Sequence, residues 1–144
     1  MACSEPSMKR INALDKRVEI AERKFKDIEK EFDKLVDDYA RVSDILRESN
    51  TPKQELYLFR AYLQQFEDVR DELTSEMTYS HSQLDKLRND MGKGLYDDAQ
   101  RTEYLDSEEK AIEMIEARLN YFSERFKEQK EFEQLEEDIF TMED

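Results

Sequence analysis

The single histidine of the chain stands between two serines, Ser80-His81-Ser82, and these residue types can carry nucleophilic chemistry. A serine nucleophile needs a histidine base within hydrogen-bond reach and a third group that orients the imidazole ring. Successive residues of a helix point in different directions, and the sequence places no acid where it would orient the ring of His81. We therefore expect a structural or exposed histidine, and we predict no catalytic residue and no enzymatic activity.

Metal and cofactor chemistry is also not expected. Acidic helical bundles can hold two iron ions, but such a site needs two Glu-x-x-His motifs, and the chain has one His. The sequence has no Cys/His zinc spacing, no Gly-rich phosphate loop and no EF-hand loop. Its two glycines, Gly92 and Gly94, stand in one turn. We predict no metal, no cofactor and no small-molecule substrate.

The charge balance and the single cysteine restrict the partners and the compartment. The chain carries 23 Lys+Arg and 37 Asp+Glu, for a formal net charge of −14, so DNA, RNA and anionic lipid repel it at long range. No apolar run approaches the roughly 20 residues of a membrane-spanning helix, and the first residues lack the apolar core of a secretory signal. Cys3 cannot form an internal disulfide. We expect a cytoplasmic or nuclear protein without nucleic-acid partners and without stable membrane insertion.

The composition predicts long helices, because 42% of the residues are charged and only two Gly and two Pro interrupt the chain. Any functional side chain must therefore be positioned by such a helix. In the first segment, apolar residues recur at alternating steps of three and four, which is the stripe of a left-handed coiled coil. They are Ile11, Leu14, Val18, Ala21, Phe25, Ile28, Phe32, Leu35, Tyr39, Val42 and Leu46. The sequence predicts a helix over about residues 9–49, behind a disordered tail at 1–8.

A second helix is predicted over about residues 52–91. Thr51 is a good N-cap, Pro52 suits the first helical position, and Gln54 completes a Thr-x-x-Gln capping box. The stripe then repeats at Leu56, Phe59, Leu63, Phe66, Arg70, Leu73, Met77, Ser80, Leu84, Leu87 and Met91. Two of its positions are therefore polar, and Arg70 either sets the register within the core or extends its charged end to solvent.

A third helix is predicted over about residues 97–141. Gly92 and Gly94 are expected to take left-handed conformations that end the second helix. Asp97-Asp98 can then start the third, although Asp106 is an alternative start. The third stripe is less regular, because Glu108 occupies one of its positions and the spacing shifts after Phe126. Its apolar residues are Leu105, Ile112, Ile115, Leu119, Phe122 and Phe126, followed by Phe132, Leu135, Ile139 and Met142.

Three stripes joined by short turns predict an all-α, elongated, antiparallel three-helix coiled-coil bundle that forms a single domain over residues 9–144. Residues 95–144 hold 6 basic and 17 acidic residues, so we expect the third helix to pair with basic residues of the first. The architecture resembles a spectrin-type repeat. Spectrin repeats commonly carry a Trp in their first helix, whereas this chain has no Trp and places Phe25 or Phe32 there. No residue role follows from this resemblance.

Two regions are candidate partner-binding surfaces. Residues 56–63 are apolar around most of a helix, and such a helix is either enclosed or held against a partner. Residues 132–142 combine apolar with acidic side chains. We predict partner contacts from Tyr57, Leu58, Tyr62, Phe132, Leu135, Ile139 and Phe140. Alternatively, the two regions pack on each other, because they fall at the same end of an up-down-up bundle.

These features predict a non-catalytic coiled-coil scaffold or adaptor subunit of a larger intracellular assembly. Residues 11–87 resemble small helical subunits of kinetochore and vesicle-tethering complexes, and cytoskeletal assemblies use similar proteins. Expected partners are other coiled-coil or helical proteins or a second copy, and monomer and homodimer both stay open. The alternative is a peripheral membrane-surface or curvature-associated bundle, for which the first helix offers Lys9, Arg10, Lys16, Arg17, Arg23, Lys24 and Lys26.

Overall fold

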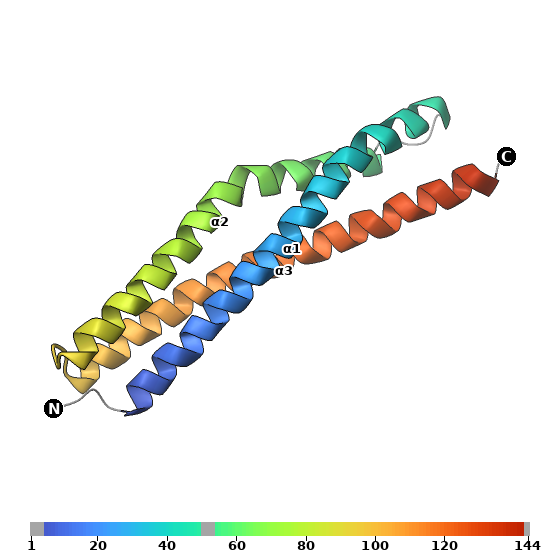
Figure 1. The fold of residues 1–144 in the computed structure, drawn as a ribbon. Helices are drawn as coiled ribbons and strands as arrows, with labels where there is room; N and C mark the ends of the chain where they lie inside the picture. The colour runs from blue at the N-terminus through green and yellow to red at the C-terminus, as the bar shows by residue number, and fades with distance from the viewer. Residues whose placement is uncertain (1–4, 50–53, 143–144) are drawn as a thin grey trace. The chain divides into compact units, whose positions relative to one another are not determined.

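The computed structural model describes the backbone of residues 5–49 and 54–142, and the side chains of these ranges except 42, 45–49, 54–56 and 131–142. Three helices account for nearly all of it: α1 (Glu5–Ser49), α2 (Gln54–Gly92) and α3 (Asp98–Met142) (Figure 1). No strand occurs in the described ranges. The predicted all-α three-helix bundle is confirmed.

The helix ends differ in detail from those predicted. α1 begins at Glu5, four residues before the expected start, so part of the predicted tail at 1–8 is helical. An acidic residue in the first turn and a proline beside it suit a helix start, because the carboxylate faces the positive end of the helix dipole and proline needs no hydrogen-bond partner there. The predicted cap at Thr51 and Pro52 lies outside the described residues.

The connection between α2 and α3 is a compact turn. The N–H of Leu95 donates to the carbonyl of Asp90 at 3.2 Å and that of Gly94 to Met91 at 3.0 Å, the pattern of a Schellman motif. Gly94 has a φ of 69°, while Gly92 is the last residue of α2, so only the second glycine takes the left-handed conformation expected of both.

The start of α3 is a capping box. The Asp97 carboxylate accepts the N–H of Gln100 at 2.8 Å, and the Gln100 side chain accepts the N–H of Asp97 at 3.0 Å. This reciprocal pair satisfies two backbone donors that the first helical turn would otherwise leave open. α3 therefore starts beside Asp97, and the alternative start at Asp106 is not used.

The two glycines of this turn should respond differently to substitution by alanine. We expect Gly94→Ala to lower the free energy of unfolding by about 1–2 kcal/mol, because a Cβ strains the left-handed conformation. Gly92→Ala is the matched control, since an added Cβ there meets nothing within 4 Å. It should be neutral or raise stability by up to about 1 kcal/mol. Urea unfolding followed by circular dichroism measures both; equal effects would refute the assigned roles.

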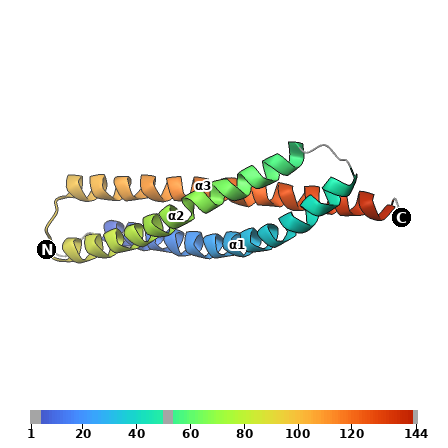
Figure 2. The same cartoon turned by 90° about the horizontal axis from the view of Figure 1, so that it is seen from above.

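The chain divides into two compact units, and the single domain predicted over residues 9–144 stays a prediction. Unit 1 comprises Met1–Lys24 and Asp71–Arg118, and unit 2 comprises Phe25–Arg70 and Leu119–Asp144. Each helix therefore contributes one segment to each unit. In unit 1 the three segments run alongside one another in both views (blue, yellow and orange in Figures 1 and 2).

In the core of unit 1, the predicted apolar stripes of the three helices pack against one another. Its central cluster takes residues from all three helices: Ile11, Leu14, Val18, Leu84, Leu87, Met91, Leu105 and Ile112. Ser80 is 1% exposed, so the polar position of the second stripe lies inside the core as a small side chain.

Ion pairs between the helices of unit 1 give the direction of α3 relative to α1 and connect α2 to α1. Arg10 pairs with Glu109 of α3 at 2.8 Å and Arg17 with Glu116 at 2.5 Å, so α1 and α3 are parallel. On α2, Arg88 pairs with Asp15 of α1. The expected pairing of acidic α3 with basic α1 is thus present in this unit.

The core of unit 2 is built on phenylalanines. Phe66 is fully buried, and its ring lies with centroids 4.9–6.0 Å from four others, those of Phe25, Phe32, Phe122 and Phe126. Arg70 takes the second of the two alternatives: its charged end reaches the surface, pairs with Glu29 at 2.7 Å and lies over the Phe32 ring. The guanidinium thereby covers the edge of the aromatic core.

Candidate partner-binding surface

The apolar start of α2 turns two large side chains toward solvent. Phe59 and Leu63 follow the stripe and are 1% and 8% exposed. Tyr57 and Leu58 project from other sides of the same helix and are 66% and 48% exposed. A helix that is apolar on several sides can bury only the side that faces its neighbours. The apolar surface of Tyr57 and Leu58 is therefore left uncovered by the described side chains.

Tyr62 lies one helical turn after Leu58 and is half-buried beneath a residue of α3. The Arg125 guanidinium carbon is 5.9 Å from the centroid of the Tyr62 ring and 5.3 Å from that of Tyr121. The Tyr121 hydroxyl donates to Gln65 Oε1 of α2 at 2.8 Å. We call the set of Leu58, Tyr62, Tyr121 and Arg125 the aromatic face of unit 2.

The electrostatics of this face centre on Arg125. Its guanidinium also donates to Glu128 at 2.8 Å, and this hydrogen bond is the main reason that the pKa of Arg125 is raised. The charge is held over two tyrosine rings and close to solvent, and it is paired with Glu128 of its own helix. Tyrosine and arginine presented together are typical of the residues that dominate protein–protein binding.

Sequence reasoning missed Tyr121 and Arg125. Each immediately precedes a buried phenylalanine of the third stripe, Phe122 or Phe126, so the periodicity places both on the flank of α3. That flank position was the available signal. Which residues of α2 they contact depends on how α2 and α3 are aligned, and the periodicity of either helix alone does not contain that information.

Gln129 helps to set how the start of α2 is aligned with α3. It is 5% exposed, and its amide donates to the backbone carbonyls of Phe59 at 3.1 Å and Leu58 at 3.5 Å. A buried amide favours an alignment that gives its N–H groups acceptors, because any other leaves them unpaired in an apolar core. The side-chain oxygen of Gln129 is buried with no hydrogen-bond partner among the described residues. Gln129 thus positions Leu58 relative to α3.

The remaining predicted contacts lie at the end of α3. Phe132, Leu135, Ile139 and Phe140 belong to the α3 backbone within unit 2, but their side chains lie outside the described ones. They stay predictions. Of the seven predicted residues, the structure thus describes Tyr57 and Leu58 as exposed and Tyr62 as part of the aromatic face.

The surroundings of His81 come from α1 as well as from its own helix. Two acids of α1 flank its ring: Nδ1 lies 3.7 Å from Asp15 and Nε2 lies 3.6 Å from Glu22. Both acids come from a different helix and lie beyond hydrogen-bond distance, and Nδ1 has no hydrogen-bond partner among the described residues. Ser80 is buried in the core of unit 1 and Ser82 is exposed. The arrangement is a contact between α1 and α2 with polar groups on both sides of the imidazole.

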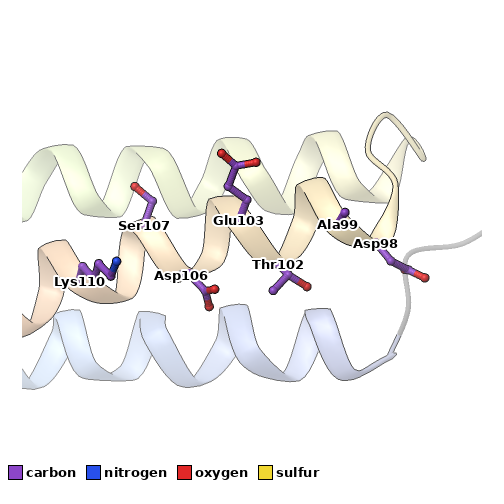
Figure 3. Close-up of a pocket in the computed structure, with 7 residues that line it drawn as sticks. All are labelled: Asp98, Ala99, Thr102, Glu103, Asp106, Ser107 and Lys110. Carbon is purple, nitrogen blue, oxygen red and sulfur yellow. The ribbon is translucent and has the colours of Figure 1, made fainter.

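An open hollow follows the first turns of α3 in unit 1 (Figure 3). It is lined by Asp98, Ala99, Thr102, Glu103, Asp106, Ser107 and Lys110. All seven residues come from one helix, and two of the carboxylates are engaged, Asp106 by Arg10 and Asp98 by Arg101. The hollow therefore offers a charged surface without the convergent groups from several elements that a binding pocket uses.

Two other kinds of site are not formed by the described ranges. Among those residues, no group of three or more His, Cys, Asp or Glu is placed to hold a metal ion. No described helix combines the length and apolar character that crossing a membrane requires.

The fold and the aromatic face define the class of this protein as an all-α three-helix bundle in which Arg125 of α3 lies over tyrosine rings of α2 and α3. No protein-family model, no curated protein and no solved structure matches the chain.

Proposed function

We propose that this protein is a non-catalytic scaffold or adaptor subunit of a larger intracellular assembly, of the cytoskeletal, kinetochore or vesicle-tethering kind. It acts by packing a helix of another protein against its own helices. The observation that carries the proposal is the aromatic face of unit 2, in which Leu58 is exposed one helical turn before Tyr62 and Arg125 lies over the rings of Tyr62 and Tyr121.

The composition of this face suits a helical partner. Leu58 and Tyr62 are four residues apart, so they form a stripe along one side of α2 that an amphipathic helix can contact through residues at the same spacing. Arg125 stands beside the stripe with two aromatic rings beneath it. Large exposed apolar residues next to an arginine supply both the buried area and the charge that interface centres use.

Partner capture tests the proposal directly. The double variant Leu58→Ser with Arg125→Ala removes the apolar and the charged component, and both side chains are accessible enough that the fold should be retained. We expect at least about tenfold lower recovery of the proteins that the wild type captures, equivalent to about 1.4 kcal/mol. Affinity capture with quantitative mass spectrometry measures it, and chemical crosslinking should join the partner to α2 or α3 of unit 2.

The matched control is Tyr79→Ser, which removes a 62%-exposed aromatic residue of α2 in unit 1. It should leave capture unchanged. The proposal is wrong if the wild type captures no protein, or if the double variant and the control capture the same partners equally.

A further inference from the structure

A second surface lies on the outward side of α1 in unit 1. Lys9, Lys16 and Arg23 are exposed there, seven residues apart, and make no ion pair with any described residue. Arg10 and Arg17 of the same helix differ, because they are engaged by carboxylates of α3. Three cations on one line thus remain available on a chain whose net charge is −14.

Apolar residues alternate with these cations. Ala13 and Ile20 are exposed between them, Ile20 at 58%, so the line Lys9-Ala13-Lys16-Ile20-Arg23 advances by four, three, four and three. This is the spacing of a second coiled-coil stripe, on the opposite side of α1 from the core. Ala13 permits close approach of another helix, and Ile20 supplies apolar area.

The chain itself contains a segment with the complementary pattern. Residues 131–144 hold seven acidic and no basic residues, with apolar Phe132, Leu135, Ile139 and Met142 at steps of three, four and three. Carboxylates recur seven residues apart, as in Glu131 and Asp138 or Glu137 and Asp144. Residues 131–142 belong to α3 and span about 18 Å at 1.5 Å per residue, close to the roughly 21 Å from Lys9 to Arg23.

We propose that residues 131–144 of a second copy of this chain dock along the Lys9–Arg23 line of α1. We choose this segment as the partner because its carboxylates and the cations of the Lys9–Arg23 line both recur every seven residues. An anionic membrane surface fits less well, because three cations fall below the roughly four to eight that polybasic lipid binding uses, and Glu19 stands among them. The docking does not involve the aromatic face, so it can hold or fail independently of the proposed function.

Charge exchange between the two surfaces tests the proposal. One variant of the full chain carries Lys9→Glu, Lys16→Glu and Arg23→Glu; a second carries Glu131→Lys, Glu137→Lys and Asp144→Lys. Each alone should weaken self-association at low salt by at least about a hundredfold, because like charges then face each other. A mixture of the two variants, or one chain carrying all six changes, should restore it. Sedimentation equilibrium over a range of concentrations measures the association constant.

The matched control reverses three exposed cations elsewhere in unit 1: Lys86, Lys93 and Lys110, each to Glu. It changes the net charge equally and should reduce association far less than reversal of the α1 line. Salt of about 0.5 M should weaken wild-type association by screening. A wild type that stays monomeric, a control with the same effect, or six changes that fail to restore association would each overturn the proposal, as would monomers bound to anionic vesicles through Lys9, Lys16 and Arg23.

Discussion

Phe66→Ala should lower the free energy of unfolding by about 3–5 kcal/mol, the largest effect we expect from a single substitution in this chain. The ring is fully buried and lies among four other phenylalanine rings. Its removal loses the transfer free energy of the ring and leaves a cavity whose rigid aromatic walls cannot easily close. Since small domains are stable by about 5–15 kcal/mol, the loss is a large fraction of the total.

Urea unfolding of Phe66→Ala by circular dichroism measures this loss, and Tyr57→Ala is its control. Tyr57 belongs to the same helix but is 66% exposed, so its truncation should change stability by less than about 0.5 kcal/mol. If both variants lose similar stability, the phenylalanine cluster is not the core of unit 2.

Glu108→Leu should raise stability at neutral pH by about 1–3 kcal/mol, which is unusual for a substitution at a core position. Glu108 occupies the third stripe between Leu105 and Ile112, and one carboxylate oxygen is buried with no hydrogen-bond partner among the described residues. Burial raises the pKa of this carboxyl. Leucine removes the cost of the buried charge and adds apolar area to the core.

The effect should depend on pH with a definite sign. A carboxyl whose pKa is raised by folding costs stability when ionised, so the wild type recovers stability as pH falls through the folded pKa toward the unfolded value of about 4.3. The advantage of Glu108→Leu should therefore be largest near pH 7 and shrink on acidification. Unfolding curves between about pH 7 and pH 4 measure it, and Glu108→Gln separates loss of charge from gain of area.

Glu109, the next residue, should behave in the opposite way. Hydrogen bonding from Arg10 is the main cause of its lowered pKa, and Arg17 adds to it. A lowered carboxyl pKa contributes stability above the unfolded pKa, and this is lost as pH falls through the folded one. Glu109→Gln should accordingly lower the free energy of unfolding at neutral pH by no more than a surface ion pair contributes. The difference in stability between this variant and the wild type should disappear at acidic pH. If Glu108 and Glu109 variants showed the same pH dependence, the assigned environments would be wrong.

The periodicity of the chain was enough to predict the fold class and the core. In α1, the stripe positions from Ile11 to Leu35 are all buried, because a repeat of three and four residues keeps one side of a helix turned toward its neighbours. The same rule found Phe66 on α2 and Phe122 on α3. Apolar spacing is a local property, and burial follows from it whichever helices become neighbours.

Side chains that act across helices depended on the tertiary structure. His81 meets Asp15 and Glu22, and Arg125 covers Tyr62, only because particular turns of two helices are level with each other. A stripe that repeats every seven residues fits a partner equally well after a shift of seven, so periodicity leaves this alignment open. Non-periodic groups decide it: the buried amide of Gln129, the ion pairs of Arg10 and Arg17, and the tight turn at Gly94.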